Sequence, residues 1–282
     1  MNNILIADAG SSKTDWSLLT DKDDEVIRIK TLGINPANDS EESIGKIFLD
    51  IKELLSDNKV DKIFYYGAGC ASDALKNKIK VLLSGFFHSV DITVDSDLMA
   101  AAKAVFGDSD GIIGILGTGS NSGIYKKGKL ESPIPSLGFI LGDEGGGVSL
   151  GKRLLNSVFK KQLPVEVIEL FQEEYKLSVS ELIHKVYGNS RPAPFIASFT
   201  PFLKKYIEIP EIKKLVALEM ENYFQKNLLT IGGINEYEIG MVGSIAYTFR
   251  DIITEYAKNN GLNILTILKN PLPKLESYYL SK

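Results

Sequence analysis

The chain has 282 residues, of which 44% are hydrophobic, and this is enough for about two domains with cores of their own, which excludes disordered and fibrous classes. Its 36 acidic and 32 basic residues give a formal charge of −4, without the basic excess that binding to nucleic acid requires. A single cysteine, no apolar stretch near the roughly 20 residues that cross a bilayer, and no secretory signal at the start lead us to expect a soluble, cytoplasmic protein that does not bind membranes.

The start of the chain predicts an antiparallel, three-stranded meander. Short runs of β-branched and apolar residues occupy 4–7, 15–19 and 26–31. Turn-forming residues separate these runs at Gly10 to Ser12 and at Asp21 to Asp24.

An amphipathic helix is expected next, ending at about Leu55. Asp39 and Glu42 have the spacing of a capping box, and apolar residues then recur at helical period. The remaining elements expected in this half are a strand over 62–66, a helix over 73–83, a strand over 90–94 and a helix over 98–106. Together they predict an α/β unit with mixed strand directions.

The same opening then recurs in the second half. A strand over 111–116, a Gly/Ser turn and a strand over 121–125 repeat the arrangement of the first 19 residues, which suggests a duplicated domain. Turn formers cluster near 107–111, so we expect two domains, 1–107 and 108–282. The second is more helical, with helices expected over 148–161, 165–175, 180–187, 211–229 and 244–259 and a strand over 237–242.

The first turn has the chemistry of a phosphate site. A strand ends on Asp8 and enters a turn of small residues that presents backbone N–H groups, hydroxyls and an ammonium group. The candidate nucleotide-binding residues here are Gly10, Ser11, Ser12, Lys13 and Thr14. Asp8 could hold Mg²⁺, most simply through water, because that ion dehydrates reluctantly. Taken alone, the turn could equally be an ordinary hairpin.

Two further turns strengthen this interpretation. Gly117, Thr118, Gly119 and Ser120 form a second small-residue turn at the matching place, and two such turns can bind one polyphosphate. Neither turn has the spacing of a Walker A loop or of a dinucleotide-binding loop. A third turn, Gly243 and Ser244, joins a strand to a helix and could lie against an adenosine, although such turns are also common without a ligand.

In order and spacing, the three turns resemble the phosphate-1, phosphate-2 and adenosine elements of the actin-like ATPases. More specifically, the chain resembles N-acetylglucosamine kinase and its relatives in the BadF/BcrA-type ATPase family (BadF/BadG/BcrA/BcrD). Those proteins have a Gly-Thr-Gly-Ser-Asn segment like Gly117 to Asn121, followed by a segment like Leu141 to Gly145. The resemblance runs from Asp8 to about Ala246. It implies two actin-like (ribonuclease H-like) α/β domains, a nucleotide cleft between them, and ATP with Mg²⁺.

The resemblance also implies a catalytic base. Asp97 lies where a strand ends and a helix begins, and it looks like the aspartate that activates the sugar hydroxyl in this family. A carboxylate there can accept the hydroxyl proton as the oxygen attacks the γ-phosphoryl group. Two alternatives stay open at this point. Asp97 could be only the N-cap of the helix, or Asp95 could be the base.

The same resemblance implies the substrate-binding residues Asn35, Asn121 and Asp143. Asn35 could equally be a turn residue before Pro36, Asn121 could only brace its turn, and Asp143 could cap the following helix. Kinases of this family often carry a Trp six residues before the Asp-Glu pair, and Leu137 stands at that position here.

The sequence therefore favours an ATP-dependent hexosamine kinase that phosphorylates the 6-hydroxyl of N-acetylglucosamine or of a closely related amino sugar. An activator ATPase of this fold would need cysteines for an iron–sulfur cluster, and the chain has only Cys70. An actin-like switch would need no sugar site. The sequence does not determine the oligomeric state, and a homodimer is one candidate.

Overall fold

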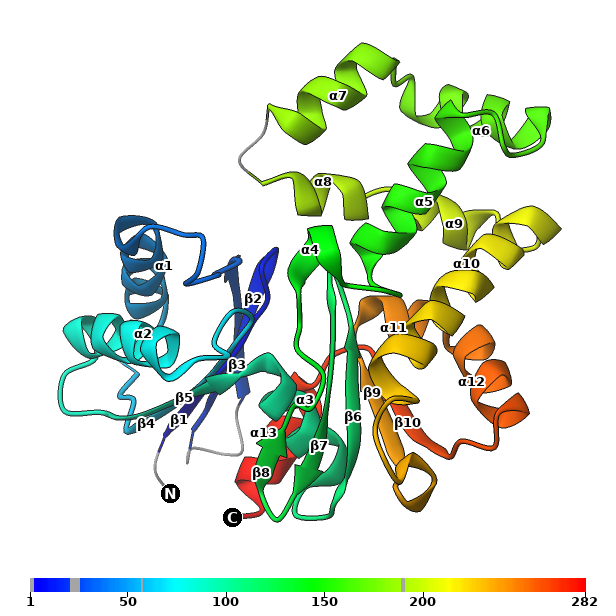
Figure 1. The fold of residues 1–282 in the computed structure, drawn as a ribbon. Coiled ribbons are helices and arrows are strands. Elements are labelled where there is room, and N and C mark those ends of the chain that lie inside the picture. The colour runs from blue at the N-terminus through cyan, green and yellow to red at the C-terminus, as the bar shows by residue number, and fades with distance from the viewer. Residues whose placement is uncertain (1–2, 21–25, 57, 189–190) are drawn as a thin grey trace. The chain divides into compact units, whose positions relative to one another are not determined.

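The computed structural model describes residues 3–20, 26–56, 58–188 and 191–282. The turn expected at Asp21 to Asp24 lies outside them. The chain divides into two compact units, shown in Figure 1: unit 1 is Met1–Ser109 with Asn270–Lys282, and unit 2 is Asp110–Lys269. The sequence predicts a single division at 107/108. In the structure the chain returns to unit 1 after Lys269, because the C-terminal helix packs against the sheet of unit 1.

Unit 1 contains a five-stranded sheet in the order β3-β2-β1-β4-β5. The predicted meander is confirmed, since β1 pairs antiparallel with β2 and β2 pairs antiparallel with β3. The pairs β1–β4 and β4–β5 are parallel, so the carboxyl ends of β1, β4 and β5 meet at one edge. The bounds are β1 (Ile4–Ala9), β2 (Lys13–Leu19), β3 (Val26–Leu32), β4 (Lys62–Gly67) and β5 (Asp91–Ser96).

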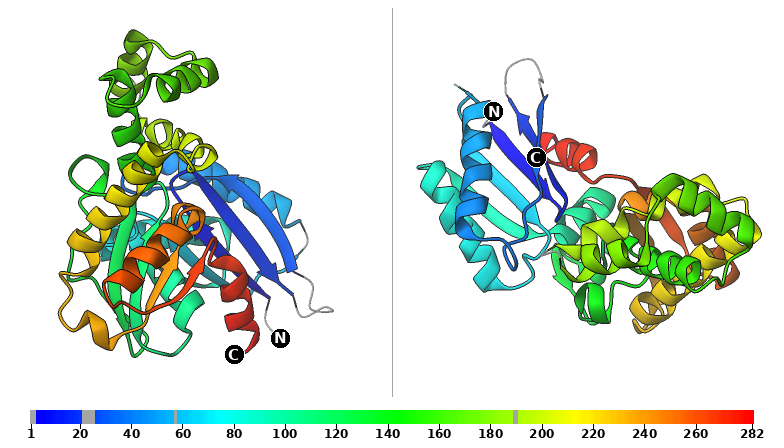
Figure 2. Two further views of the ribbon diagram at one scale, coloured as in Figure 1. Left: turned by 90° about the vertical axis from the view of Figure 1, so that its right-hand side faces the viewer. Right: turned by 90° about the horizontal axis from the view of Figure 1, so that it is seen from above.

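Helices cover both faces of this sheet. Figure 2 shows α1 and α2 on one face and α13 on the other, where α13 also packs against α3. The core beneath α1 and α2 is rich in aromatic residues, among which Trp16, Phe48 and Tyr65 contact one another. The bounds are α1 (Glu41–Leu54), α2 (Asp73–Phe86), α3 (Asp97–Phe106) and α13 (Leu272–Leu280).

The start of α1 differs from the predicted capping box. Ser40 is the N-cap, and its hydroxyl accepts the N–H of Ser43 at 3.2 Å. Asp39 lies one position too early to cap the helix, and its carboxylate instead accepts the N–H of Asn35. The capping box of Asp39 with Glu42 is therefore wrong.

Unit 2 repeats the sheet of unit 1. Its strand order, β8-β7-β6-β9-β10, matches β3-β2-β1-β4-β5 position by position, with the same pattern of antiparallel and parallel pairs. The predicted duplication is thus confirmed, although β8 and β10 were not predicted. The bounds are β6 (Gly111–Leu116), β7 (Ser120–Lys126), β8 (Lys129–Glu131), β9 (Ile239–Val242) and β10 (Ile264–Leu268).

The helices of unit 2 pack around one large apolar core. The helix predicted over 211–229 is α10 followed by a short π-helix, and the one predicted over 244–259 is divided at Phe249, whose backbone leaves the helical region. The described residues contain no helix long and apolar enough to span a membrane. The bounds are α4 (Gly138–Leu141), α5 (Gly147–Phe159), α6 (Val165–Tyr175), α7 (Val179–Tyr187), α8 (Pro192–Ala197), α9 (Thr200–Lys205), α10 (Pro210–Tyr223), η1 (Phe224–Leu228), η2 (Ile234–Glu236), α11 (Ser244–Thr248) and α12 (Arg250–Asn259).

Candidate active site

The first predicted phosphate turn connects β1 to β2 in unit 1. It is closed by the N–H of Gly10, which donates to the carbonyl of Lys13 at 2.9 Å. The Lys13 side chain is largely exposed and forms an ion pair with Asp15. Exposure leaves the ammonium group accessible to an anionic ligand, with Asp15 as its present partner.

A second loop of unit 1 is packed directly on this turn. A side chain at Gly33 would place its Cβ only 2.4 Å from the carbonyl carbon of Ser11, so only glycine permits the approach. The N–H of Ile34 donates to the carbonyl of Gly10 at 3.1 Å, and Asn35 Nδ2 lies 3.4 Å from Ser11 Oγ. The candidate sugar residue Asn35 and the phosphate turn therefore form one structural piece.

Carboxylates crowd the end of β1. Asp8 stands directly opposite Asp15 in the β1–β2 register. Burial, followed by the negative charges of Asp97 and Asp15, raises the pKa of Asp8 to about 7, with Lys13 acting in the opposite direction. Sequence reasoning missed Asp15, because its place beside Asp8 follows from the pairing register. A cation beside Asp8 would relieve this repulsion.

Asp97 is the first residue of α3, at the same sheet edge as Asp8. The N-cap of α3 is Ser96, whose hydroxyl accepts the N–H of Met99 at 3.2 Å, so the N-cap interpretation of Asp97 is wrong. Asp95, the alternative base, is held in an ion pair with Lys76 at 2.7 Å. Of the two carboxylates, Asp97 is the one whose charge acts on Asp8.

The second phosphate turn lies between β6 and β7 in unit 2. The N–H of Gly117 donates to the carbonyl of Gly119 at 2.9 Å. The start of α5 is bound to the same turn, because the N–H groups of Gly147 and Val148 donate to the carbonyls of Gly117 and Thr118. The turn is therefore fixed by the helix that follows the Asp143 segment.

Asp143 lies against this turn. Its Oδ1 accepts the N–H of Ser120 at 3.1 Å, and a Cβ at Gly119 would come within 2.7 Å of its carboxylate. Asp143 has a positive φ of 60°, and burial raises the pKa of its carboxyl group. The N-cap of α5 is Gly146, which has no side-chain cap, so Asp143 does not cap the helix.

Glu144, which follows Asp143, is fixed separately and was not predicted as a site residue. Its carboxylate accepts hydrogen bonds from Lys226 at 3.1 Å and Asn227 at 3.4 Å, both in η1. Burial disfavours its charged form, but its backbone hydrogen bond and these two contacts outweigh that effect and lower the pKa of Glu144. The π-helix therefore braces the Asp143–Glu144 segment.

The other predicted residues of unit 2 lie around the same turn. Asn121 Oδ1 accepts the N–H of Ser122, and the carbonyl of Asn121 accepts the hydroxyl of Tyr223. Gly243 follows β9 and has a φ of 126°, and a Cβ there would lie 2.2 Å from the carbonyl oxygen of Leu116. The Gly243–Ser244 turn thus lies beside the second phosphate turn.

The residues of both turns fit a phosphate ligand. Among the described residues, three buried side-chain oxygens have no hydrogen-bond partner, Thr14 Oγ1, Tyr65 Oη and Ser120 Oγ, and the first and last of these belong to the two turns. These two occupy corresponding places, since Thr14 pairs with the last residue of β1 and Ser120 with the last residue of β6. A buried hydroxyl needs a partner, and phosphate oxygens are suitable acceptors.

The same residues fit Mg²⁺ only as an ion that shares its coordination with phosphate. Within the part of the chain that the structure describes, no three His, Cys, Asp or Glu side chains form a metal cluster. Mg²⁺ usually binds through one or two carboxylates together with substrate phosphates and water. Asp8 is the carboxylate available for that role in unit 1.

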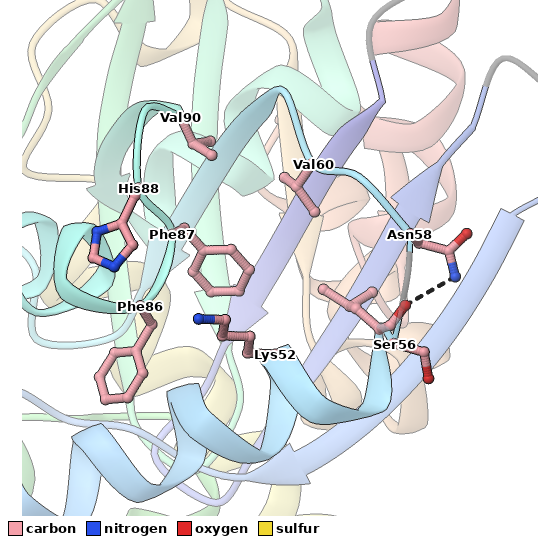
Figure 3. Close-up of a pocket in the computed structure, with 9 residues that line it drawn as sticks. Lys52, Ser56, Asn58, Val60, Phe86, Phe87, His88 and Val90 are labelled. Carbon is pink, nitrogen blue, oxygen red and sulfur yellow. Dashed lines mark hydrogen bonds between the residues drawn. The ribbon is translucent and has the colours of Figure 1, made fainter.

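A separate cavity in unit 1, of about 280 Å³, lies at the C-terminal ends of α1 and α2. Figure 3 shows that Lys52 and Asn58 line it together with Phe86, Phe87 and His88. No predicted site residue lines it, and the carboxyl ends of β1, β4 and β5 are at the other end of the sheet. We do not assign it to the active site.

A comparison with known proteins identifies the family. No protein-family model and no curated protein matches the chain. A solved structure, the putative N-acetylglucosamine kinase of Porphyromonas gingivalis, is 32% identical, covers 99% of both chains and superposes with a TM-score of 0.93. The chain belongs to this sugar kinase family.

Two more distant sugar kinases share the fold alone. The putative N-acetylglucosamine kinase of Chromobacterium violaceum is 14% identical over 99% of both chains, with a TM-score of 0.79. The ROK family glucokinase of Streptomyces griseus, solved with glucose and AMPPNP, is 14% identical over 98% of both chains, with a TM-score of 0.56. The actin-like, two-unit α/β fold expected from the sequence is thereby confirmed for this sugar kinase.

Proposed function

We propose that this protein transfers the γ-phosphoryl group of ATP to the 6-hydroxyl of N-acetylglucosamine or of a closely related amino sugar. The observation that carries the proposal is the carboxylate pair Asp8 and Asp97. The two groups lie at the edge where parallel strands end, beside the phosphate turn, and close enough for each charge to act on the other. The 32% identity to a kinase named for this sugar supports the choice of substrate.

The two glycine-rich turns bind the phosphates of ATP. In unit 1, the backbone of Gly10 to Ser12 and the hydroxyl of Thr14 supply hydrogen-bond donors, and Lys13 supplies a positive charge. In unit 2, Gly117 to Ser120 supply the corresponding donors, and the Gly243–Ser244 turn contacts the adenosine. Preorganised donors of this kind stabilise the charge that spreads over the transferred group.

Asp8 is the carboxylate that would hold Mg²⁺. When bound, the ion neutralises charge on the phosphate oxygens. The raised pKa of Asp8 supports this role, because an acid with repelling neighbours gains most from a nearby cation.

Asp97 is the general base. It accepts the proton of the sugar 6-hydroxyl as that oxygen attacks phosphorus, and the phosphoryl group leaves ADP. Asp95 is a weaker candidate because Lys76 already neutralises it. Asn35, Asn121 and Asp143 are the residues that we propose for sugar binding.

The acetamido group has a polar amide, which needs hydrogen-bond partners, and an apolar methyl group, which needs an apolar wall. Selectivity for the acetylated sugar would follow from a site that provides both. Leu137, next to α4, is 58% exposed and offers a smaller apolar wall than the Trp common at this position. A site that pairs a polar group leaves buried partners unpaired when that group is missing, which disfavours glucose. A smaller wall also leaves room for a larger substituent on the sugar.

The test is a comparison of N-acetylglucosamine, N-acetylmuramic acid, glucosamine and glucose under identical conditions with ATP and Mg²⁺. ADP release gives kcat/KM, and phosphorus NMR of the product gives the position of the phosphate. We expect the highest kcat/KM for an N-acetylated sugar and a phosphate at the 6-position. Equal or better use of glucose would overturn the amino-sugar assignment, and ATP consumption without any sugar acceptor would favour an activator or switch.

A further inference from the structure

The Asn35 loop is organised by hydrogen bonds that converge on one residue. The N–H of Asn35 donates to Asp39 Oδ2 at 2.7 Å, and the carbonyl of Asn35 accepts the N–H groups of Asn38 and Asp39 at 3.0 and 2.8 Å. The side-chain Oδ1 of Asn35 accepts the N–H of Ala37 at 3.1 Å. The backbone and the side-chain oxygen of Asn35 are thus all used within the loop.

These contacts fix which way the amide of Asn35 points. The N–H of Ala37 donates to the amide oxygen, which places the amide nitrogen on the other side. The nitrogen carries two N–H groups, and its contact with Ser11 Oγ, at 3.4 Å, is long. The loop therefore presents Asn35 as a hydrogen-bond donor with capacity for an oxygen of a ligand.

A lysine of helix α2 forms hydrogen bonds with the backbone of the same loop. Lys78, which is partly buried on α2, donates from Nζ to the carbonyl oxygens of Pro36 at 2.9 Å and of Asp39 at 3.3 Å. Hydrogen bonds from a charged donor are about twice as strong as neutral ones. Gly69 packs closely against the Asn35 side chain, since a Cβ at Gly69 would lie 2.4 Å from Asn35 Oδ1.

We propose that Asp39 and Lys78 are positioning residues that fix the Asn35 amide as a donor to a sugar oxygen. The inference rests on the proposed function, because it takes the ligand of Asn35 to be the sugar. Neither residue needs to touch substrate. Loss of either residue makes the loop less rigid, which weakens sugar binding and leaves the rate of the chemical step at Asp97 unchanged.

The first measurement compares Lys78→Met with Lys78→Arg and with Lys80→Met as a control. Lys80 is exposed on the same helix, so its substitution removes a similar side chain without touching the loop. With N-acetylglucosamine and saturating ATP, we expect Lys78→Met to raise the KM for the sugar about tenfold. Lys78→Arg should recover part of this loss, and kcat and the KM for ATP should stay near wild type. Asp39→Ala should behave like Lys78→Met.

A double-mutant cycle then tests whether Lys78 acts through Asn35. If it does, Lys78→Met adds little to the KM of an Asn35→Ala protein, because the group that it positions is gone. Additive effects would overturn the inference, as would equal increases in KM for sugar and ATP. Thermal unfolding of each variant identifies any that fails to fold, and Lys78→Gln, which removes the charge, then replaces Lys78→Met in the cycle.

The two proposals fail in different ways. A folded wild-type protein that phosphorylates no sugar overturns the proposed function and this inference together. A wild-type protein that phosphorylates an amino sugar while the cycle is additive overturns only the positioning role.

Discussion

At the scale of single residues, the site is defined by acids that repel one another. Asp8 is flanked by the charges of Asp97 and Asp15, and Lys13 only partly compensates them. Asp8 could be proposed from its place at the end of a predicted strand, and Asp97 from the resemblance to the kinase family. Sequence motifs could not select Asp15 or Glu144, whose roles depend on strand register and on a π-helix more than 80 residues away in the chain.

Asp97→Asn should abolish most phosphoryl transfer and retain nucleotide binding. The amide keeps the shape of the side chain but cannot accept the proton, and loss of a general base costs about 10²–10⁴-fold in rate. Because Ser96 caps α3, the substitution leaves the cap intact. Turnover at saturating sugar and ATP is the measurement, with calorimetric titration of ATP as the control. Turnover near the wild-type value would remove Asp97 from the mechanism.

Asp8→Asn should stabilise the ligand-free protein, and more so as the pH rises. The pKa of Asp8 is about 7 in the folded state and 3.8 for an unperturbed aspartate, so between these values the folded state holds the extra proton. The stability of the wild type therefore falls as pH rises from about 4 to 7 and then levels off. The Asp8→Asn protein does not lose stability in this way, because asparagine does not ionise.

Urea unfolding without nucleotide or Mg²⁺, at several pH values from 5 to 8, measures the difference in unfolding free energy between Asp8→Asn and wild type. We expect it to grow from pH 5 to about 7 and then to level off. A difference that does not change with pH would show that Asp8 ionises at an ordinary pKa.

At the scale of elements, the fold was largely predictable where hydrophobic period was strong. The short apolar runs of β1 and β2 and the helical period of α1 and α6 predicted elements close to those observed. The N-cap of α1 was not predictable from spacing alone, because Asp39 and Ser40 are both suitable residues. β10 was missed although its apolar run is bounded by turn formers, and β8 has only three residues.

The site loops were predictable as turns but not as contacts. Nothing in the local sequence indicates that Gly33 packs on Ser11 or that Gly119 packs on Asp143, because these approaches join segments distant in the chain. The need for glycine at such a position becomes clear only when the structure shows which residue packs against it.

Gly33→Ala should destabilise the protein and disturb the first phosphate turn. Its Cβ would lie 2.4 to 2.6 Å from backbone atoms of Gly10 and Ser11, which cannot rotate away. We expect a loss of unfolding free energy of about 1–3 kcal/mol, typical of overpacking. Gly85→Ala is the matched control, since its Cβ meets nothing within 4 Å and alanine favours the helix by up to about 1 kcal/mol. Urea titration of both variants measures their unfolding free energies. If Gly33→Ala were as stable as Gly85→Ala, the close packing of Gly33 on Ser11 would be contradicted.

At the scale of the whole molecule, unit 1 is completed by the end of the chain. Glu276 of α13 is buried and accepts hydrogen bonds from Ser17 Oγ at 2.7 Å and from Arg28 Nε at 2.9 Å. Tyr279 stacks on Phe64 with ring centroids 4.1 Å apart. The sequence did not predict that α13 packs on unit 1, because α13 carries no motif of its own and its packing partners β1, β2 and α3 all lie before residue 107.

Glu276→Ala should destabilise the protein by about 1–3 kcal/mol, because it leaves the hydroxyl of Ser17 buried without an acceptor. Glu276→Gln should cost less, since its amide oxygen can still accept that hydroxyl. Arg28 is mostly exposed and can be solvated in both variants. Chemical unfolding compares the three proteins, and an alanine variant as stable as the glutamine variant would show that the contact with Ser17 contributes nothing.

The divided unit 1 has a consequence for synthesis on the ribosome. Unit 2 is one continuous segment, Asp110–Lys269, and can acquire all its own contacts while the ribosome is still adding residues. Unit 1 begins to emerge first but must wait for Asn270–Lys282 before the face of its sheet beneath α13 is covered. We therefore expect the nascent chain to reverse the usual order in which N-terminal domains fold first. Until Asn270–Lys282 have emerged, the sheet face that α13 covers stays exposed, and we expect a chaperone to bind there.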